Sequence, residues 1–174
     1  MIMQLSDPGT LSRDEIQRNI ELLKSRNGME RQRARIALVT IGTQAIDFFA
    51  ELATHPQDTV RWEAVKGLGQ LMDPVTAPIL VNALEDENTA VRWLAAEGLV
   101  KLNKNGLIPL LEALTRQKIT IFLREGAHHV IKSLARKYPS EEIRKLLKSL
   151  DLTTNHSDVP ILARNLLEIL SAGK

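Results

Sequence analysis

The sequence contains no cysteine, few aromatic residues and no long apolar run, and each absence excludes a class of protein. Without cysteine, the chain has no disulfide bond, no thiolate metal site and no cysteine nucleophile. Aromatic residues make up only 3% of the chain, which argues against a β-sheet protein because strands favour aromatic side chains. No stretch approaches the roughly 20 apolar residues of a membrane-spanning helix, and the first residues lack the pattern of an export signal. We therefore expect a cytoplasmic protein that does not associate with a membrane.

Charge is nearly balanced overall but is distributed unevenly along the sequence. The net charge is +2, and 44% of the residues are hydrophobic, which is enough for a buried core in a chain of 174 residues. The first 87 residues contain 9 Lys+Arg and 13 Asp+Glu, whereas the last 87 contain 14 and 8. The carboxy-terminal half is therefore basic.

The main positive feature of the sequence is an internal repeat. Val60-Arg61-Trp62 recurs as Val91-Arg92-Trp93 at a spacing of 31 residues, and the apolar positions that follow recur with it. Four units share the pattern Arg-x-x-Ala-x-x-x-Leu-x-x-Leu, with Ile allowed at the last two positions. Their arginines are Arg31, Arg61, Arg92 and Arg124. The apolar spacing of three, four and three residues predicts one helix per unit.

A second apolar run follows each repeat helix after a short connector, so each unit is predicted to be a helical hairpin. One hairpin cannot bury its own apolar face, and neighbouring units must therefore stack. At the amino end, Ser12 and Glu15 have the spacing of a helix-capping box. The sequence predicts an all-α, right-handed α-solenoid of about five hairpins that forms a single domain, residues 1–174. Capping helices at 1–27 and 151–174 would flank repeats at 28–57, 58–87, 88–117 and 118–150.

The segment DTVRWEAVKGLGQLMDPVTAPILVNALEDENTAVRWLAAEGLVKL, residues 58–102, resembles the short HEAT-like repeats of phycobilisome lyases and related bacterial scaffolds. In that family the recurring arginine is structural and is often paired with an aspartate six residues earlier. Asp86 and Arg92 keep this spacing, whereas His55 and Arg61 do not. The resemblance implies a fold more than a function, because scaffolds, lyases, a hydroxylase and DNA glycosylases all contain such repeats.

In the resembling family the repeat helix lines the concave side of the solenoid. The phase of the helix points Trp62 and its equivalents away from the apolar stripe, so successive repeats would form rows on a groove floor. Two exposed tryptophans one repeat apart, with Gly69 leaving room beside the first, predict a site for a peptide, a planar ring or a nucleobase. The alternative is that either tryptophan packs over the seam between helices. The candidate partner-binding residues are Trp62, Lys66, Trp93, Glu97, Val100, Glu125, His129 and Lys132.

Residues 116–148 form a basic region that would attract nucleic acid or an acidic protein. Its cations are Arg116, Lys118, Arg124, Lys132, Arg136, Lys137, Arg144, Lys145 and Lys148. The alternative is an ordinary solvated helix face, with Arg124 serving as the structural arginine of its repeat.

Enzyme functions find less support in the sequence. Glu125 and His129 share a helical face, but a metal site needs a third ligand. The similar repeats of deoxyhypusine hydroxylase carry iron-binding His-Glu pairs just after the recurring arginine, where this chain has Trp62-Glu63 and Trp93-Leu94. That resemblance therefore does not imply the iron activity. We expect a non-enzymatic adaptor without metal or cofactor that binds a protein or peptide; a nucleic-acid-binding protein, a DNA glycosylase and a phycobilin lyase remain alternatives.

Overall fold

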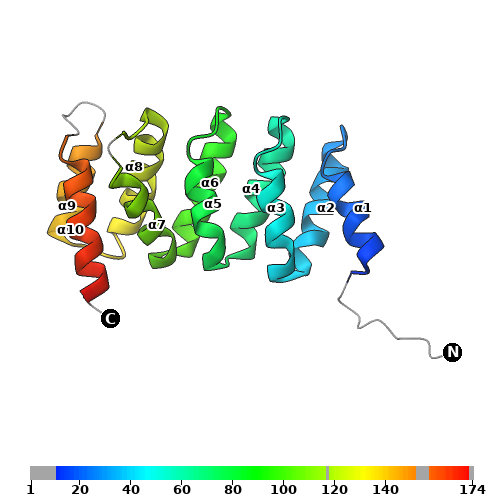
Figure 1. Ribbon diagram of the computed structural model, residues 1–174, viewed down its shortest axis with the longest axis horizontal. Coiled ribbons are helices and arrows are strands. Elements are labelled where there is room, and N and C mark those ends of the chain that lie inside the picture. The colour runs from blue at the N-terminus through cyan, green and yellow to red at the C-terminus, as the bar shows by residue number, and fades with distance from the viewer. Residues whose placement is uncertain (1–10, 117, 152–156, 173–174) are drawn as a thin grey trace.

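The computed structural model describes residues 11–116, 118–151 and 157–172. Within these ranges the chain forms ten α-helices and two short 3-10 helices, and it contains no strand. Figure 1 shows the helices side by side in one row, with the amino-terminal and carboxy-terminal helices at opposite ends of the long axis. The prediction of an all-α solenoid of stacked hairpins is confirmed.

The helices follow the apolar runs of the sequence closely. In chain order they are α1 (Arg13–Leu22), α2 (Gly28–Thr40), η1 (Gly42–Ala45), α3 (Ile46–Leu52), α4 (Asp58–Leu71), η2 (Pro74–Thr76), α5 (Ala77–Ala83), α6 (Thr89–Leu102), α7 (Lys104–Leu114), α8 (Ile121–Ala135), α9 (Glu141–Leu150) and α10 (Val159–Ala172). The four repeat helices are α2, α4, α6 and α8.

The repeat helices form one layer, in which α2 packs against α4, α4 against α6, and α6 against α8. In the second layer α5 packs against α7, and α7 packs against α10. The carboxy-terminal end departs from the regular pattern, because α9 lies against α8 while α10 lies against both α7 and α9. The last two helices therefore close both layers of the stack.

The core is built from the positions that define the repeat pattern. The alanines of the four units are fully buried, and so are the next apolar residues along each helix. These residues are Ala34, Ala64, Ala95 and Ala127, and Leu38, Leu68, Leu99 and Ile131. Small and large side chains therefore recur at the same heights in each repeat, which lets equivalent helices pack in register.

The helix caps explain where several helices begin. The predicted capping box is present: the Glu15 amide donates to Ser12 Oγ at 3.3 Å, and the Ser12 amide donates to Glu15 Oε2 at 2.8 Å. In α6 the cap is Asn88, whose Oδ1 accepts a hydrogen bond from the Ala90 amide. The side-chain amide of Asn88 also donates to Asp58 Oδ2 at 2.7 Å. This cap therefore links the beginnings of two successive repeat helices.

Met72 ends α4 in the left-handed conformation, with φ 52° and ψ 25°, and its side chain is exposed. Side chains disfavour this conformation, whereas glycine adopts it freely and is the usual residue at such helix ends. We expect Met72→Gly to raise the free energy of unfolding by about 0.5–1 kcal/mol, measured by urea titration. Lys101→Gly, inside the last turn of α6, is the matched control and should lower stability by a similar amount. A loss of stability in both variants would contradict the prediction.

Candidate functional site

A groove of about 730 Å³ lies between the repeat helices α4 and α6. Its floor includes Gly69 and Gly98, which face each other: a Cβ atom added to Gly69 would lie 3.3 Å from the Cα atom of Gly98. The two helices can therefore approach closely, and no side chains rise from this part of the floor. The lining residues are Trp62, Lys66, Gly69 and Gln70 from α4, and Thr89, Ala90, Trp93, Leu94, Glu97, Gly98 and Lys101 from α6.

The two tryptophans line the same groove but differ in exposure. Trp93 is 57% exposed, whereas Trp62 is half-buried and packs against the hydrophobic core. The ammonium nitrogen of Lys66 lies 4.3 Å from the centroid of the Trp62 ring, which is the geometry of a cation–π contact. Of the two possibilities that the sequence left open, exposure applies to Trp93 and packing against the core applies to Trp62. Trp93 is the one that offers most of its surface to solvent.

The groove carries more positive than negative charge. Burial lowers the pKa of Lys66, the positive charges of Arg35 and Lys101 lower it further, and the nearby Glu63 acts in the opposite direction. In the part of the chain that the structure describes, neither Lys66 nor Lys101 forms an ion pair. The carboxylate of the groove, Glu97, lies 2.8 Å from Nε2 of His129 on α8. Two unpaired lysines therefore remain at the groove.

A buried ion pair lies between α2 and α4 behind the groove, and the sequence analysis missed it. Arg35 Nε donates to Glu63 Oε2 at 2.8 Å, and the two residues are only 2% and 3% exposed. Arg35 Nη1 also donates to Oε1 of Gln70, at one end of the groove. A signal was available, because the equivalent positions one repeat later are apolar: Val65 corresponds to Arg35, and Leu94 to Glu63. Opposite charges at two such positions in adjacent repeats indicate a pair.

Three of the recurring arginines bind the main chain of the connector that precedes their own helix. Nη1 of Arg31, Arg61 and Arg92 each donates to the carbonyl oxygen six residues earlier, at 2.8, 2.9 and 2.7 Å. A main-chain acceptor explains why the side chain at that position varies among Ser25, His55 and Asp86.

The resemblance implied that Asp86 pairs with Arg92, but the Asp86 carboxylate binds Arg61, which lies 25 residues earlier in the same repeat. The two bonds are 2.7 Å from Nε to Oδ2 and 3.0 Å from Nη2 to Oδ1. This bidentate pair therefore ties α4 to the connector before α6.

Acid should weaken this link. Burial raises the pKa of Asp86, but hydrogen bonds from Arg61 and the Asn88 amide, with the charges of Arg61 and Arg92, outweigh it and hold the pKa below its ordinary value. A carboxyl group with a lowered pKa stabilises the fold above its unfolded pKa, near pH 4, and this stability is lost as pH falls through the folded pKa. We expect the free energy of unfolding to decline below about pH 4, and Asp86→Asn to show a shallower decline. Urea midpoints measured from neutral to acidic pH check this, and parallel curves for the two proteins would contradict it.

Four of the eight predicted site residues meet at the groove: Trp62, Lys66, Trp93 and Glu97. The other four lie outside its lining. Val100 is half-buried against the core, and Glu125, His129 and Lys132 are exposed on α8. The sequence analysis missed Gln70, Ala90, Leu94 and Lys101. The groove lies between two helices, so its lining includes residues on the side of α6 that faces α4. The helical phase selected only the residues that point away from the apolar stripe.

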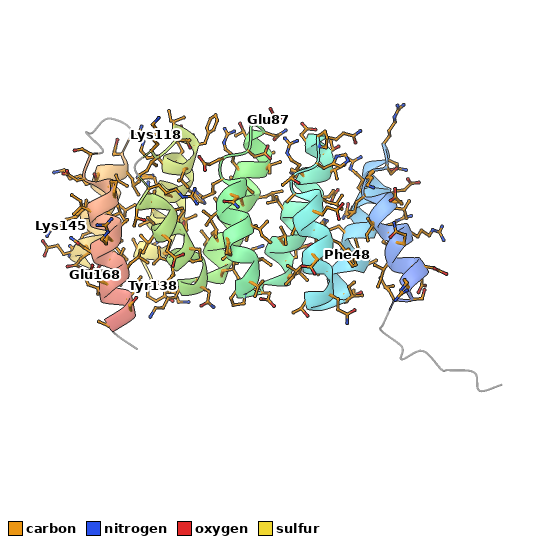
Figure 2. The ribbon with its side chains drawn as sticks, in the orientation of Figure 1. Phe48, Glu87, Lys118, Tyr138, Lys145 and Glu168 are labelled. Carbon is orange, nitrogen blue, oxygen red and sulfur yellow. The ribbon has the colours of Figure 1, made fainter. Side chains whose placement is uncertain are left out.

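Two cations of the basic region lie on different parts of the molecule. Figure 2 shows Lys118 near the upper edge, the edge along which Glu87 also lies, and Lys145 on the flank formed by the last helices. Arg124 is buried, as expected for the structural arginine of its repeat, and Lys137 donates to Asn103 Oδ1 at 2.7 Å. Lys118 and Lys145 therefore do not lie together, and Arg124 is not available to a partner.

The described residues contain no group of three His, Asp or Glu side chains that could hold a metal ion. Glu63 stands where the His-Glu pairs described in the sequence analysis have their glutamate, and here its carboxylate accepts a hydrogen bond from Arg35. None of the described helices combines the length and the apolar character needed to cross a membrane.

Comparison with known proteins agrees with this architecture. Residues 16–86 match the family model for HEAT repeats. The chain is built of HEAT-like repeats. Deoxyhypusine hydroxylase from Candida albicans is 36% identical over 87 residues, which cover 48% of this chain and 27% of the hydroxylase. The match thus spans about a quarter of that relative's length.

One solved structure shares the helical arrangement. The complex of CpcE and CpcF of phycocyanin lyase from Nostoc sp. PCC7120 contains a chain with a TM-score of 0.59 and 22% identity, covering 88% of this chain and 99% of that one. An engineered protein has a TM-score of 0.43 and 21% identity, covering 91% and 81%. At these identities the likeness concerns the fold alone.

Proposed function

We propose that this chain is a non-enzymatic adaptor that binds a segment of another protein in the groove between α4 and α6. The observation that carries the proposal is Trp93, a large side chain that is 57% exposed beside an open groove. Tryptophan is enriched at the energetic centres of protein interfaces because it contributes a large contact area at a low cost in conformational entropy. Exposure of such a side chain next to a concavity is typical of a binding surface.

The dimensions of the groove suit an extended peptide. Its lining on α6 runs from Thr89 to Lys101, which corresponds to about 18 Å of helix at 1.5 Å per residue. An extended chain rises about 3.3 Å per residue, so five or six residues would fill this length. The apolar contacts would come from Trp93, Leu94 and Ala90, with Trp62 as the opposite wall.

Two further considerations support a protein partner. The structural neighbour CpcE–CpcF was solved as a complex of two proteins, and its chain shares the fold of this one. The nucleic-acid alternative has less support, because Lys118 and Lys145 lie on different parts of the molecule and Arg124 is buried. We propose that these cations at most add long-range attraction for an acidic partner.

The test is selection of peptides from a display library of random dodecapeptides on the wild-type protein, followed by affinity measurements. We expect Trp93→Ala to weaken binding of the selected peptides by about 30-fold, equivalent to roughly 2 kcal/mol, because it removes the exposed anchor. The variant should keep the melting temperature of the wild type, since Trp93 is mostly exposed.

Ile161→Ala is the matched control, because Ile161 is an equally exposed apolar residue on α10, far along the chain from the groove. It should change the affinities by less than about twofold. If every selected peptide binds Trp93→Ala as tightly as the wild type, the groove is not the binding site and the proposal fails.

A further inference from the structure

The occupant of the groove can be specified further on the basis of the proposed function. We infer that the bound segment is an acidic extended peptide, which places an apolar or aromatic side chain against Trp93 and carboxylates beside Lys66 and Lys101.

The groove is polar at one end and apolar at the other. Trp62, Ala90, Trp93 and Leu94 lie in the first half of their helices, whereas Gln70 and Lys101 lie in the last turns. Lys66 lies about one helical turn beyond Trp62 and one turn before Gln70. Because α4 and α6 are equivalent helices of successive repeats, their apolar halves lie at the same end. A ligand that fits both ends must itself combine apolar and charged side chains.

The charged end is positive because the nearby carboxylates have other partners. Glu63 is buried and bonded to Arg35 at 2.8 Å, and Glu97 lies 2.8 Å from the ring of His129. Lys66 has no carboxylate partner within the described chain and rests instead on the Trp62 ring, 4.3 Å from its centroid. Its lowered pKa has the same origin, since burial and two neighbouring cations, Arg35 and Lys101, disfavour its charged form. A ligand carboxylate would relieve this unfavourable environment.

The position of Lys66 is informative for a second reason. A lysine in the last turn of a helix, such as Lys101, is favoured there by the partial negative charge of the helix end. Lys66 lies in the middle of α4, where no such effect operates. Attraction to the helix end therefore does not account for the placement of Lys66 at the groove, and this placement fits the recognition of an anion.

The test uses the peptides selected on the wild-type protein whose binding depends on Trp93. We expect them to contain an excess of Asp and Glu within about four residues of an apolar side chain, and to be depleted in Lys and Arg. In anisotropy titrations with the tightest of these peptides, Lys66→Gln combined with Lys101→Gln should weaken binding about tenfold. The loss should shrink as salt is raised, because salt screens the ion pairs.

The controls separate charge from packing. Lys66→Arg combined with Lys101→Arg keeps both positive charges and should bind within about threefold of the wild type. Lys104→Gln combined with Lys118→Gln removes two cations outside the groove and should bind like the wild type. Replacing each Glu and Asp of the peptide by Lys should abolish binding.

The outcomes distinguish this inference from the proposed function. If peptides bind in a Trp93-dependent way but lack acidic residues, or ignore the loss of both lysines, the inference is wrong and the adaptor function stands. If no peptide shows Trp93 dependence, both fail. If a single-stranded hexanucleotide binds in a Trp93-dependent way and more tightly than any selected peptide, the lysines serve a phosphate backbone and the peptide assignment is overturned.

Discussion

We expect the replacement of Arg61 by methionine to lower the free energy of unfolding by about 3–5 kcal/mol, which urea titration at neutral pH would measure. The side chains of Arg61 and Asp86 are each only 8% exposed, and they are joined by two hydrogen bonds. The substitution leaves the Asp86 carboxylate with little solvent and without its cation, and it removes the donors to the carbonyl oxygens of His55 and Pro56. Methionine preserves the apolar part of the side chain, so the loss reports the polar contacts.

The pair formed by Arg116 and Glu85 supplies the control. Its closest atoms are 3.9 Å apart, and Arg116 is largely exposed, so Arg116→Met should cost less than about 1 kcal/mol. If Arg61→Met proves too unstable to purify, Asp86→Asn provides the measurement, since it keeps the shape of the side chain while removing its charge. Equal losses in Arg61→Met and Arg116→Met would show that the buried pair does not hold α4 to the connector before α6.

Gly106→Ala is expected to destabilise the fold by about 3 kcal/mol or more. A Cβ atom at this position would lie 2.3 Å from the carbonyl oxygen of Leu99, and 3.0 Å from both the carbonyl carbon and the Cα atom of that residue. The obstacle is main chain, so no side-chain rotation can relieve it. Helix α7 would have to move away from α6 and open the buried contacts between them.

Gly28→Ala is the control for this substitution. An added Cβ atom at residue 28 would meet only the end of the Arg31 side chain, at 3.5 Å, and alanine is the better helix former. We expect stability equal to or slightly above that of the wild type. A melting temperature for Gly106→Ala within about 2 °C of the control would mean that the two helices are not closely packed at this point.

The candidate site could be anticipated only in part, and the two tryptophans show why. The helical phase predicted that Trp62 and Trp93 point away from the apolar stripe, because phase depends only on the number of residues between positions, and both side chains line the groove. It treated the two as equivalent, yet Trp62 packs against the core while Trp93 is exposed. That difference depends on neighbouring side chains in the helices on either side, which phase does not describe.

The arginines illustrate the same division. Their recurrence indicated a structural role, and the structure shows the common acceptor to be the carbonyl oxygen six residues earlier. The partner of the Asp86 carboxylate could not be found from sequence distance. Asp86 is closer in sequence to Arg92, but the guanidinium that reaches its carboxylate belongs to Arg61, 25 residues away.

The sequence by itself determined the helices, their repeat and their stacking, because the spacing of alanine and leucine residues decides which face of each helix must be buried. It also located the capping box at Ser12, which depends on residues three positions apart. Only the tertiary structure decided the position of the groove, the burial of Arg35 with Glu63, and the seating of α10 against α7. Each of these depends on how closely two helices approach and which side chains meet between them, and such distances are set by packing across repeats rather than by spacing within one.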